Sequence, residues 1–161
     1  MIAITLSLVK NLIVLFYLVL IILVSPQGFA EQKPGAPKSW EEHAHLISRQ
    51  LDLAFEQYKD GKLKEAKLAV LDAHFGSFES KSGMEMAINT NISAARKAEI
   101  EELFKNVRLA MANPPTDSSN LKKATEEIKT LQNALQHDAL VLKKKKVSII
   151  GWSKEDEEKE E

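Results

Sequence analysis

Residues 121–142, LKKATEEIKTLQNALQHDALVL, hold the clearest structural signal in this chain. Apolar residues recur there at steps of three, four or seven positions, which places them on one face of an α-helix. The seam consists of Leu121, Ala124, Ile128, Leu131, Leu135 and Leu142. A helix with one apolar face must bury that face against other elements. The segments before it therefore decide the fold class.

Those segments also have helical periodicity, and the predicted helices lie near 39–59, 62–88, 92–112 and 118–142. Ser39 and Glu42 open the first helix with a predicted capping box, and Gly61 follows its end. The first apolar face consists of Trp40, Ala44, Ile47, Leu51, Phe55 and Tyr58. Connections this short favour antiparallel neighbours. The sequence predicts an all-α, up-down four-helix bundle over residues 39–142.

The N-terminal residues 1–30 have the pattern of a signal peptide. An unbroken apolar run covers residues 12–24, follows Lys10 and precedes Ser25 and Pro26. This run is shorter than the roughly 20 residues that a membrane-spanning helix needs. We expect cleavage after Ala30, with an uncleaved membrane anchor as the alternative. Either case predicts an exported protein, periplasmic or at the cell surface.

Composition excludes several functions. The chain has no cysteine, and therefore no disulfide, thiolate metal site or covalently attached haem. Loss of Lys10 with the signal leaves 21 basic and 23 acidic side chains, so no basic field attracts nucleic acid. Phosphate-binding loops and Ser-His-Asp signatures are missing from the sequence, so we do not expect an enzyme.

The segments that flank the bundle have linker and tail composition. Residues 31–38 form a predicted Pro/Gly linker, and residues 143–161 a charged, largely disordered tail. Four lysines at 143–146 complement the dipole of the preceding helix, or alternatively attract anionic lipid headgroups.

Residues 72–88, DAHFGSFESKSGMEMAI, form the candidate site. Glycine is unfavourable inside helices, so Gly76 and Gly83 predict a bend or break between them. The predicted metal-facing residues are His74, Glu79 and Glu85, with Glu101 or Glu102 from the third helix. Imidazole and carboxylate ligands suit iron, zinc or manganese.

Each of these residue types also has a structural interpretation. His74 borders the core and fits a hydrogen-bonded structural residue as well as a ligand. Met84 and Met86 fit core gap-fillers, or thioether ligands of copper. The glutamates of the third helix fit a solvated surface.

The order of short motifs resembles the extracytoplasmic helical domain of bacterial high-affinity iron permeases, over roughly residues 51–112. The motifs are Tyr58-x-x-Gly61, Glu65-Ala66, DAHFGSFE at 72–79, GME at 83–85, and Ala98-Glu99-Ile100-Glu101 with Phe104 and Arg108. The resemblance singles out Phe78, Glu79, Gly83, Glu85 and Glu101. The R-E-x-x-E motifs of the permease are missing, so the chain is not itself expected to be a permease.

The resemblance implies iron handling outside the cytoplasmic membrane. The predicted function is an accessory protein of iron uptake that binds the metal cation weakly, docks on a membrane iron permease, or does both. Copper or zinc are alternative cations. The alternative function is a helical interaction module of the cell envelope that binds no metal.

Overall fold

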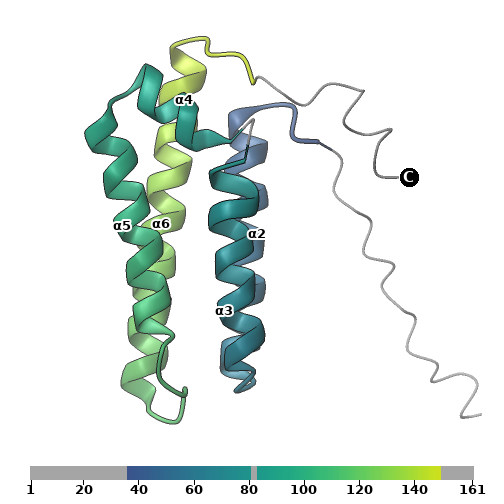
Figure 1. Ribbon diagram of the computed structural model, residues 1–161, viewed down its shortest axis with the longest axis vertical. Coiled ribbons are helices and arrows are strands. Elements are labelled where there is room, and N and C mark those ends of the chain that lie inside the picture. Colours follow the sequence, from purple (N-terminus) through teal and green to yellow (C-terminus); the bar gives the residue numbers. More distant parts are fainter. Residues whose placement is uncertain (1–35, 81–82, 150–161) are drawn as a thin grey trace, which may run out of the picture. The chain divides into compact units, whose positions relative to one another are not determined.

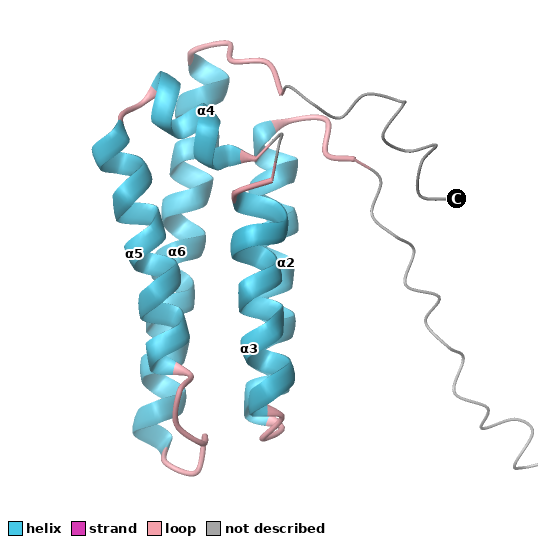
Figure 2. Ribbon diagram, viewed as in Figure 1, coloured by secondary structure: helices cyan, strands magenta, loops and turns pink. Residues whose placement is uncertain are grey.

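The computed structural model describes residues 36–80 and 83–149 of the chain. Within these ranges the secondary structure is helical, with loops and turns between the helices and no strand (Figure 2). The prediction of an all-α protein is confirmed. The predicted signal peptide, most of the predicted linker and the end of the predicted tail lie outside the described residues. No helix in the described ranges is long and apolar enough to cross a membrane.

In the described ranges, five α-helices and one π-helix pack together (Figure 1). Helix α2 packs against α3 and α6, α5 packs against α6, and the short α4 lies at one end, against α5. In chain order the elements are α2 (Trp40–Lys59), α3 (Leu63–Leu71), a π-helix (Asp72–Phe78), α4 (Met84–Asn91), α5 (Ala94–Ala110) and α6 (Ser118–Lys144).

The predicted second helix, 62–88, differs most from the structure, because it comprises α3, the π-helix and α4. The chain leaves the helix after Phe78 and resumes it at Met84, inside the predicted interval. Gly83 has a steric role there: a Cβ atom on it would lie 2.1 Å from the carbonyl oxygen of Phe78. Gly76 has open space where a Cβ would stand, so the break does not depend on it.

Side-chain caps define three helix starts. Ser39, Ser93 and Asp117 each accept a hydrogen bond from a backbone N–H in the first turn of α2, α5 and α6. Such caps satisfy donors that a helix start otherwise leaves unpaired. The predicted capping box is only half formed, because the Glu42 carboxylate accepts from the backbone N–H of Lys38, at 2.7 Å.

The core runs along the bundle axis and contains residues from all five α-helices and from the π-helix. Leu131, Leu135 and Leu142 of the predicted seam are fully buried, whereas Leu121 is partly buried. Phe78 and Phe104 contribute the neighbouring rings, with centroids 5.3 Å apart. The apolar periodicity therefore identified the buried face of α6 correctly.

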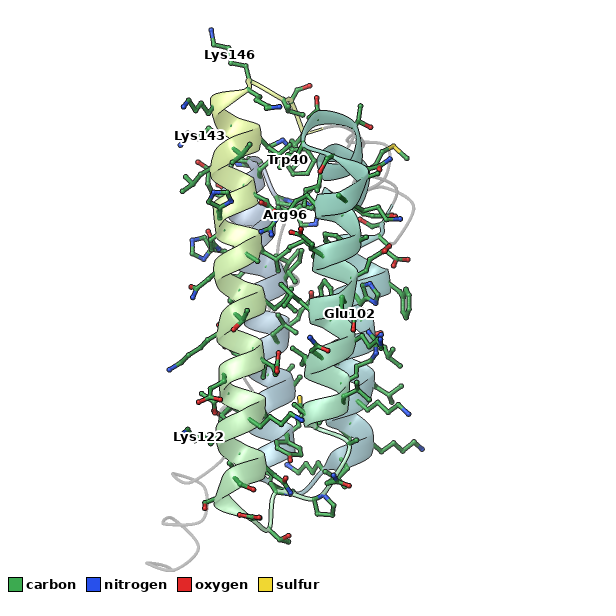
Figure 3. All side chains as sticks on the ribbon, turned by 90° about the vertical axis from the view of Figure 1, so that its left-hand side faces the viewer. Trp40, Arg96, Glu102, Lys122, Lys143 and Lys146 are labelled. Atoms are coloured by element: carbon green, nitrogen blue, oxygen red, sulfur yellow. The ribbon has the colours of Figure 1, made fainter. Side chains whose placement is uncertain are left out.

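The chain after α6 turns back onto the bundle. Lys146 has a positive φ of 58°, and the Val147 N–H donates to the Leu142 carbonyl oxygen at 3.0 Å. The Trp40 indole N–H donates to the Val147 carbonyl oxygen at 2.9 Å, and Ile149 packs against the core. Figure 3 shows Trp40, Lys143 and Lys146 at the same end of the bundle. The packed domain thus extends to residue 149, past the predicted boundary at 142.

Candidate functional site

The π-helix positions the central residues of the site. Its wide turn is closed by the Glu79 N–H, which donates to the His74 carbonyl oxygen five residues earlier, at 2.9 Å. Both His74 and Phe78 are buried by this turn, and Glu79 follows in the bridge region of backbone space (φ −91°, ψ 7°). Single π-turns within helices are rare and occur frequently at functional sites.

His74 connects two charged side chains. Its Nδ1 lies 3.2 Å from a guanidinium nitrogen of Arg108, and its Nε2 lies 3.0 Å from Oε1 of Glu79. Arginine only donates, so Nδ1 accepts and Nε2 carries the ring proton. The Glu79 oxygen lies off the direction of that N–H, which makes this a close contact and not an aligned hydrogen bond. The ring also stacks on Phe104, with centroids 4.4 Å apart.

Burial and charge shift the pKa values of this pair in opposite directions. Burial, followed by the nearby Arg108 charge, lowers the pKa of His74 to about 4, against a smaller raising effect of Glu101 and Glu85. The imidazole is therefore neutral at neutral pH. Burial raises the pKa of Glu79, and repulsion from Glu85 and Glu101 raises it further. Three carboxylates thus lie near one another and near His74.

Lys97 lies between two of these carboxylates. Its Nζ is 2.9 Å from Oε1 of Glu85 in α4 and 3.0 Å from Oε1 of Glu101, one turn later in α5. The lysine and the glutamates are about one-third exposed or less. Hydrogen bonds to both carboxylates raise the pKa of Lys97. A protein cation therefore occupies the space between the two glutamates.

Four of the five predicted metal-facing residues meet in this cluster: His74, Glu79, Glu85 and Glu101. The fifth, Glu102, pairs with Lys105 at 2.9 Å on the exposed side of α5 (Figure 3). No three His, Asp or Glu side chains in the described ranges are arranged to hold a metal ion. The predicted ligands are thus brought together, but as an ion-pair network.

The sequence prediction missed Lys97 as the centre of the network. The spacing of Lys97 and Glu101 is the signal that could have found it, because residues four apart meet on a helix surface. The partnership with Glu85 in α4 had no such local signal.

The predicted methionine pair does not form a thioether site in this arrangement. Met84 is fully buried and fills the core, whereas Met86 is 67% exposed. Of the histidines at the start of α2, His43 is buried, with Nε2 3.1 Å from the Ser77 carbonyl oxygen, and His45 is exposed. Burial lowers the pKa of His43.

Comparison with known proteins adds no further evidence. No protein-family model, curated protein or solved structure matches this chain.

Proposed function

We propose that this protein is an exported accessory component of metal-cation uptake, with iron as the expected metal and a membrane iron permease as the expected docking partner. The proposed site consists of the carboxylates of Glu79, Glu85 and Glu101 beside His74. One observation carries the proposal: a cation, the ammonium of Lys97, already lies between Glu85 and Glu101. Oxygen-rich sites of this kind suit hard or borderline cations.

Binding of a metal ion requires exchange with Lys97. The ammonium must move into solvent, and Glu79 must turn toward the vacated space. This competition costs free energy, because Lys97 loses two charge-assisted hydrogen bonds. The proposal therefore includes weak binding, which suits a protein that passes its cation on.

His74 has two roles available in this proposal. In the arrangement described here it holds Arg108 through Nδ1 and presents the protonated Nε2 toward Glu79. It becomes a ligand only after its proton moves, because a metal binds the unprotonated nitrogen of a neutral imidazole. We therefore assign the primary ligand role to the three carboxylates. The choice of iron over zinc or copper rests on the resemblance and on the ligand types.

The test is isothermal titration calorimetry of the protein with ferrous, ferric, zinc and cupric ions. Lys97→Gln removes the competing cation, so it should tighten metal binding by about tenfold, or about 1.4 kcal/mol. Glu85→Gln and Glu101→Gln should weaken it. Lys105→Gln, which changes an exposed pair on the same helix, should have no effect.

Two outcomes contradict the proposal. The first is that neither the wild type nor Lys97→Gln binds any of the four ions. The second is that Lys97→Gln and Lys105→Gln change metal affinity equally, because the effect would then be one of net charge and not of the site.

A second candidate function is an interaction module that binds no metal. Phe75 of the π-helix is 54% exposed and Met86 of α4 is 67% exposed, and both flank the candidate cluster in sequence. A contiguous exposed apolar patch marks a protein or membrane contact, and these two side chains are the candidates for such a patch. Absence of metal binding together with loss of membrane association in Phe75→Ser would favour this candidate.

A further inference from the structure

A groove of about 360 Å³ lies between α3 and the C-terminal part of α5. Leu63 contributes a partly buried apolar side chain from α3, whereas Val70 of α3 and Met111 at the end of α5 are 0% and 6% exposed and form the floor of the groove. Leu63 and Val70 are seven residues apart, so this apolar strip is about 10 Å long. The volume is at the small end of the range for ligand pockets. The groove accordingly suits one slender ligand.

The charged lining of the groove has a single sign. Lys64, Lys67 and Arg108 line it, and no acidic residue does. In residues 36–80 and 83–149 none of these three side chains forms an ion pair, whereas Lys97 and Lys105 do. Three cations around one apolar strip create a positive potential that an anionic ligand would neutralise.

Arg108 is held in position by an uncharged partner. A guanidinium nitrogen contacts Nδ1 of His74 at 3.2 Å, and this is its only side-chain hydrogen bond within the described part of the chain. A neutral imidazole does not cancel the charge of arginine, although the Glu79 carboxylate lies close enough to interact with that charge. The other N–H donors of the guanidinium remain able to bind a carboxylate in a bidentate manner.

We propose that this groove binds an amphipathic carboxylate, that is, a free aliphatic acid of medium chain length. The carboxylate pairs with Arg108 and Lys67, and the aliphatic chain lies along Leu63, over the floor that Val70 and Met111 form. A small inorganic anion would leave Leu63 uncovered, and a neutral lipid would leave the three cations unpaired. This groove adjoins the carboxylate cluster through the contact between Arg108 and His74, but binding of the acid requires no metal ion.

The test uses the full chain and sodium octanoate as the probe. Titration calorimetry measures the affinity, and ¹⁵N chemical-shift mapping locates the ligand. We expect saturable binding, with amide shifts concentrated in residues 63–70 and 108–112. Lys67→Gln and Arg108→Gln should each weaken binding by about tenfold or more, as expected for loss of a charge-assisted contact. Lys122→Gln, on exposed α6 surface, is the matched control and should leave the affinity unchanged.

Further probes distinguish the sources of the anion. Octanol and inorganic phosphate should each bind at least tenfold more weakly than octanoate. Equal binding of phosphate, equal weakening in Lys122→Gln, or shifts mapping elsewhere would overturn the proposal. Binding to phosphatidylglycerol vesicles without binding to free octanoate would also overturn it, because the charged surface would then recognise a membrane. None of these outcomes depends on whether the cluster binds metal.

Discussion

Gly83 and Gly76 have opposite roles at the residue scale. A Cβ on Gly83 would also lie 2.8 Å from the Ser80 nitrogen, whereas Gly76 is exposed with nothing within 4 Å. We expect Gly83→Ala to lower the free energy of unfolding by about 2 kcal/mol, because the backbone must move to admit the methyl group. Gly76→Ala should be neutral or stabilising by less than about 1 kcal/mol. Urea denaturation followed by circular dichroism measures both, and equal effects would contradict the steric role of Gly83.

His74 makes stability depend on pH. Its pKa is about 4 in the folded protein, below the ordinary value of 6.5, so the unfolded chain binds the proton more tightly. The contribution of neutral His74 to the free energy of unfolding is therefore complete above pH 6.5. It is lost as pH falls toward 4, by about 3 kcal/mol in total. The lowered pKa of His43 acts in the same direction, and the raised pKa of Glu79 acts against it.

The variant His74→Gln should therefore have a flatter dependence of unfolding free energy on pH between 7 and 4 than the wild type. Chemical denaturation at several pH values measures this dependence. His45→Gln is the control, because His45 is exposed and should leave the slope unchanged. An unchanged slope in His74→Gln would show that His74 is not buried in its neutral form.

At the scale of elements, the end of α6 carries a residue in an unfavourable conformation. Lys146 has φ 58°, and it immediately precedes Val147, whose N–H bonds back to Leu142 in the manner of a Schellman cap. Glycine takes this conformation without the steric cost of a Cβ, so Lys146→Gly should stabilise the protein by about 1 kcal/mol. Lys144→Gly, within the last helical turn, should destabilise it by up to about 1 kcal/mol. Thermal unfolding distinguishes the two, and destabilisation by both variants would contradict the assigned cap.

At the scale of the whole molecule, a buried ion pair joins α5 to α6. Arg96 Nε lies 2.9 and 3.1 Å from the two oxygens of Asp138, whose side chain is 1% exposed (Figure 3 labels Arg96). Arg96→Met should lower the free energy of unfolding by about 3 kcal/mol, because a buried carboxylate loses its cation. The double variant Arg96→Met/Asp138→Leu should cost less than that single variant.

Glu99 supplies the control for this cycle. It contacts Arg96 at 2.8 Å but is 62% exposed, so Glu99→Gln should change stability by less than about 0.5 kcal/mol. Urea unfolding of the wild type, Arg96→Met, Asp138→Leu and the double variant gives the coupling energy. Additive effects of the Arg96 and Asp138 substitutions would show that the pair contributes no coupling.

The helices were largely predictable because their signals are local. Apolar spacing placed the buried faces of α2 and α6, and the predicted ranges 92–112 and 118–142 agree with α5 and α6 within two residues at each end. The 62–88 helix is interrupted between Gly76 and Gly83, as predicted, but its π-helix was not predicted, because a π-turn leaves no periodic signal in seven residues. The close approach of Gly83 to the Phe78 carbonyl group depends on the path of the backbone, so the presence of a glycine in the sequence did not predict it.

The sequence by itself determined the helical class, the apolar faces and the residues of the candidate site, since these depend on side-chain type and on spacing within one helix. Only the tertiary structure decided how the site is arranged. Lys97 meets Glu85 from another helix, and Arg108 meets His74 across the bundle. Such contacts join residues far apart in the chain, so no local pattern encodes them. They form because helix packing places partly buried charged and polar side chains next to partners that lower the cost of their burial.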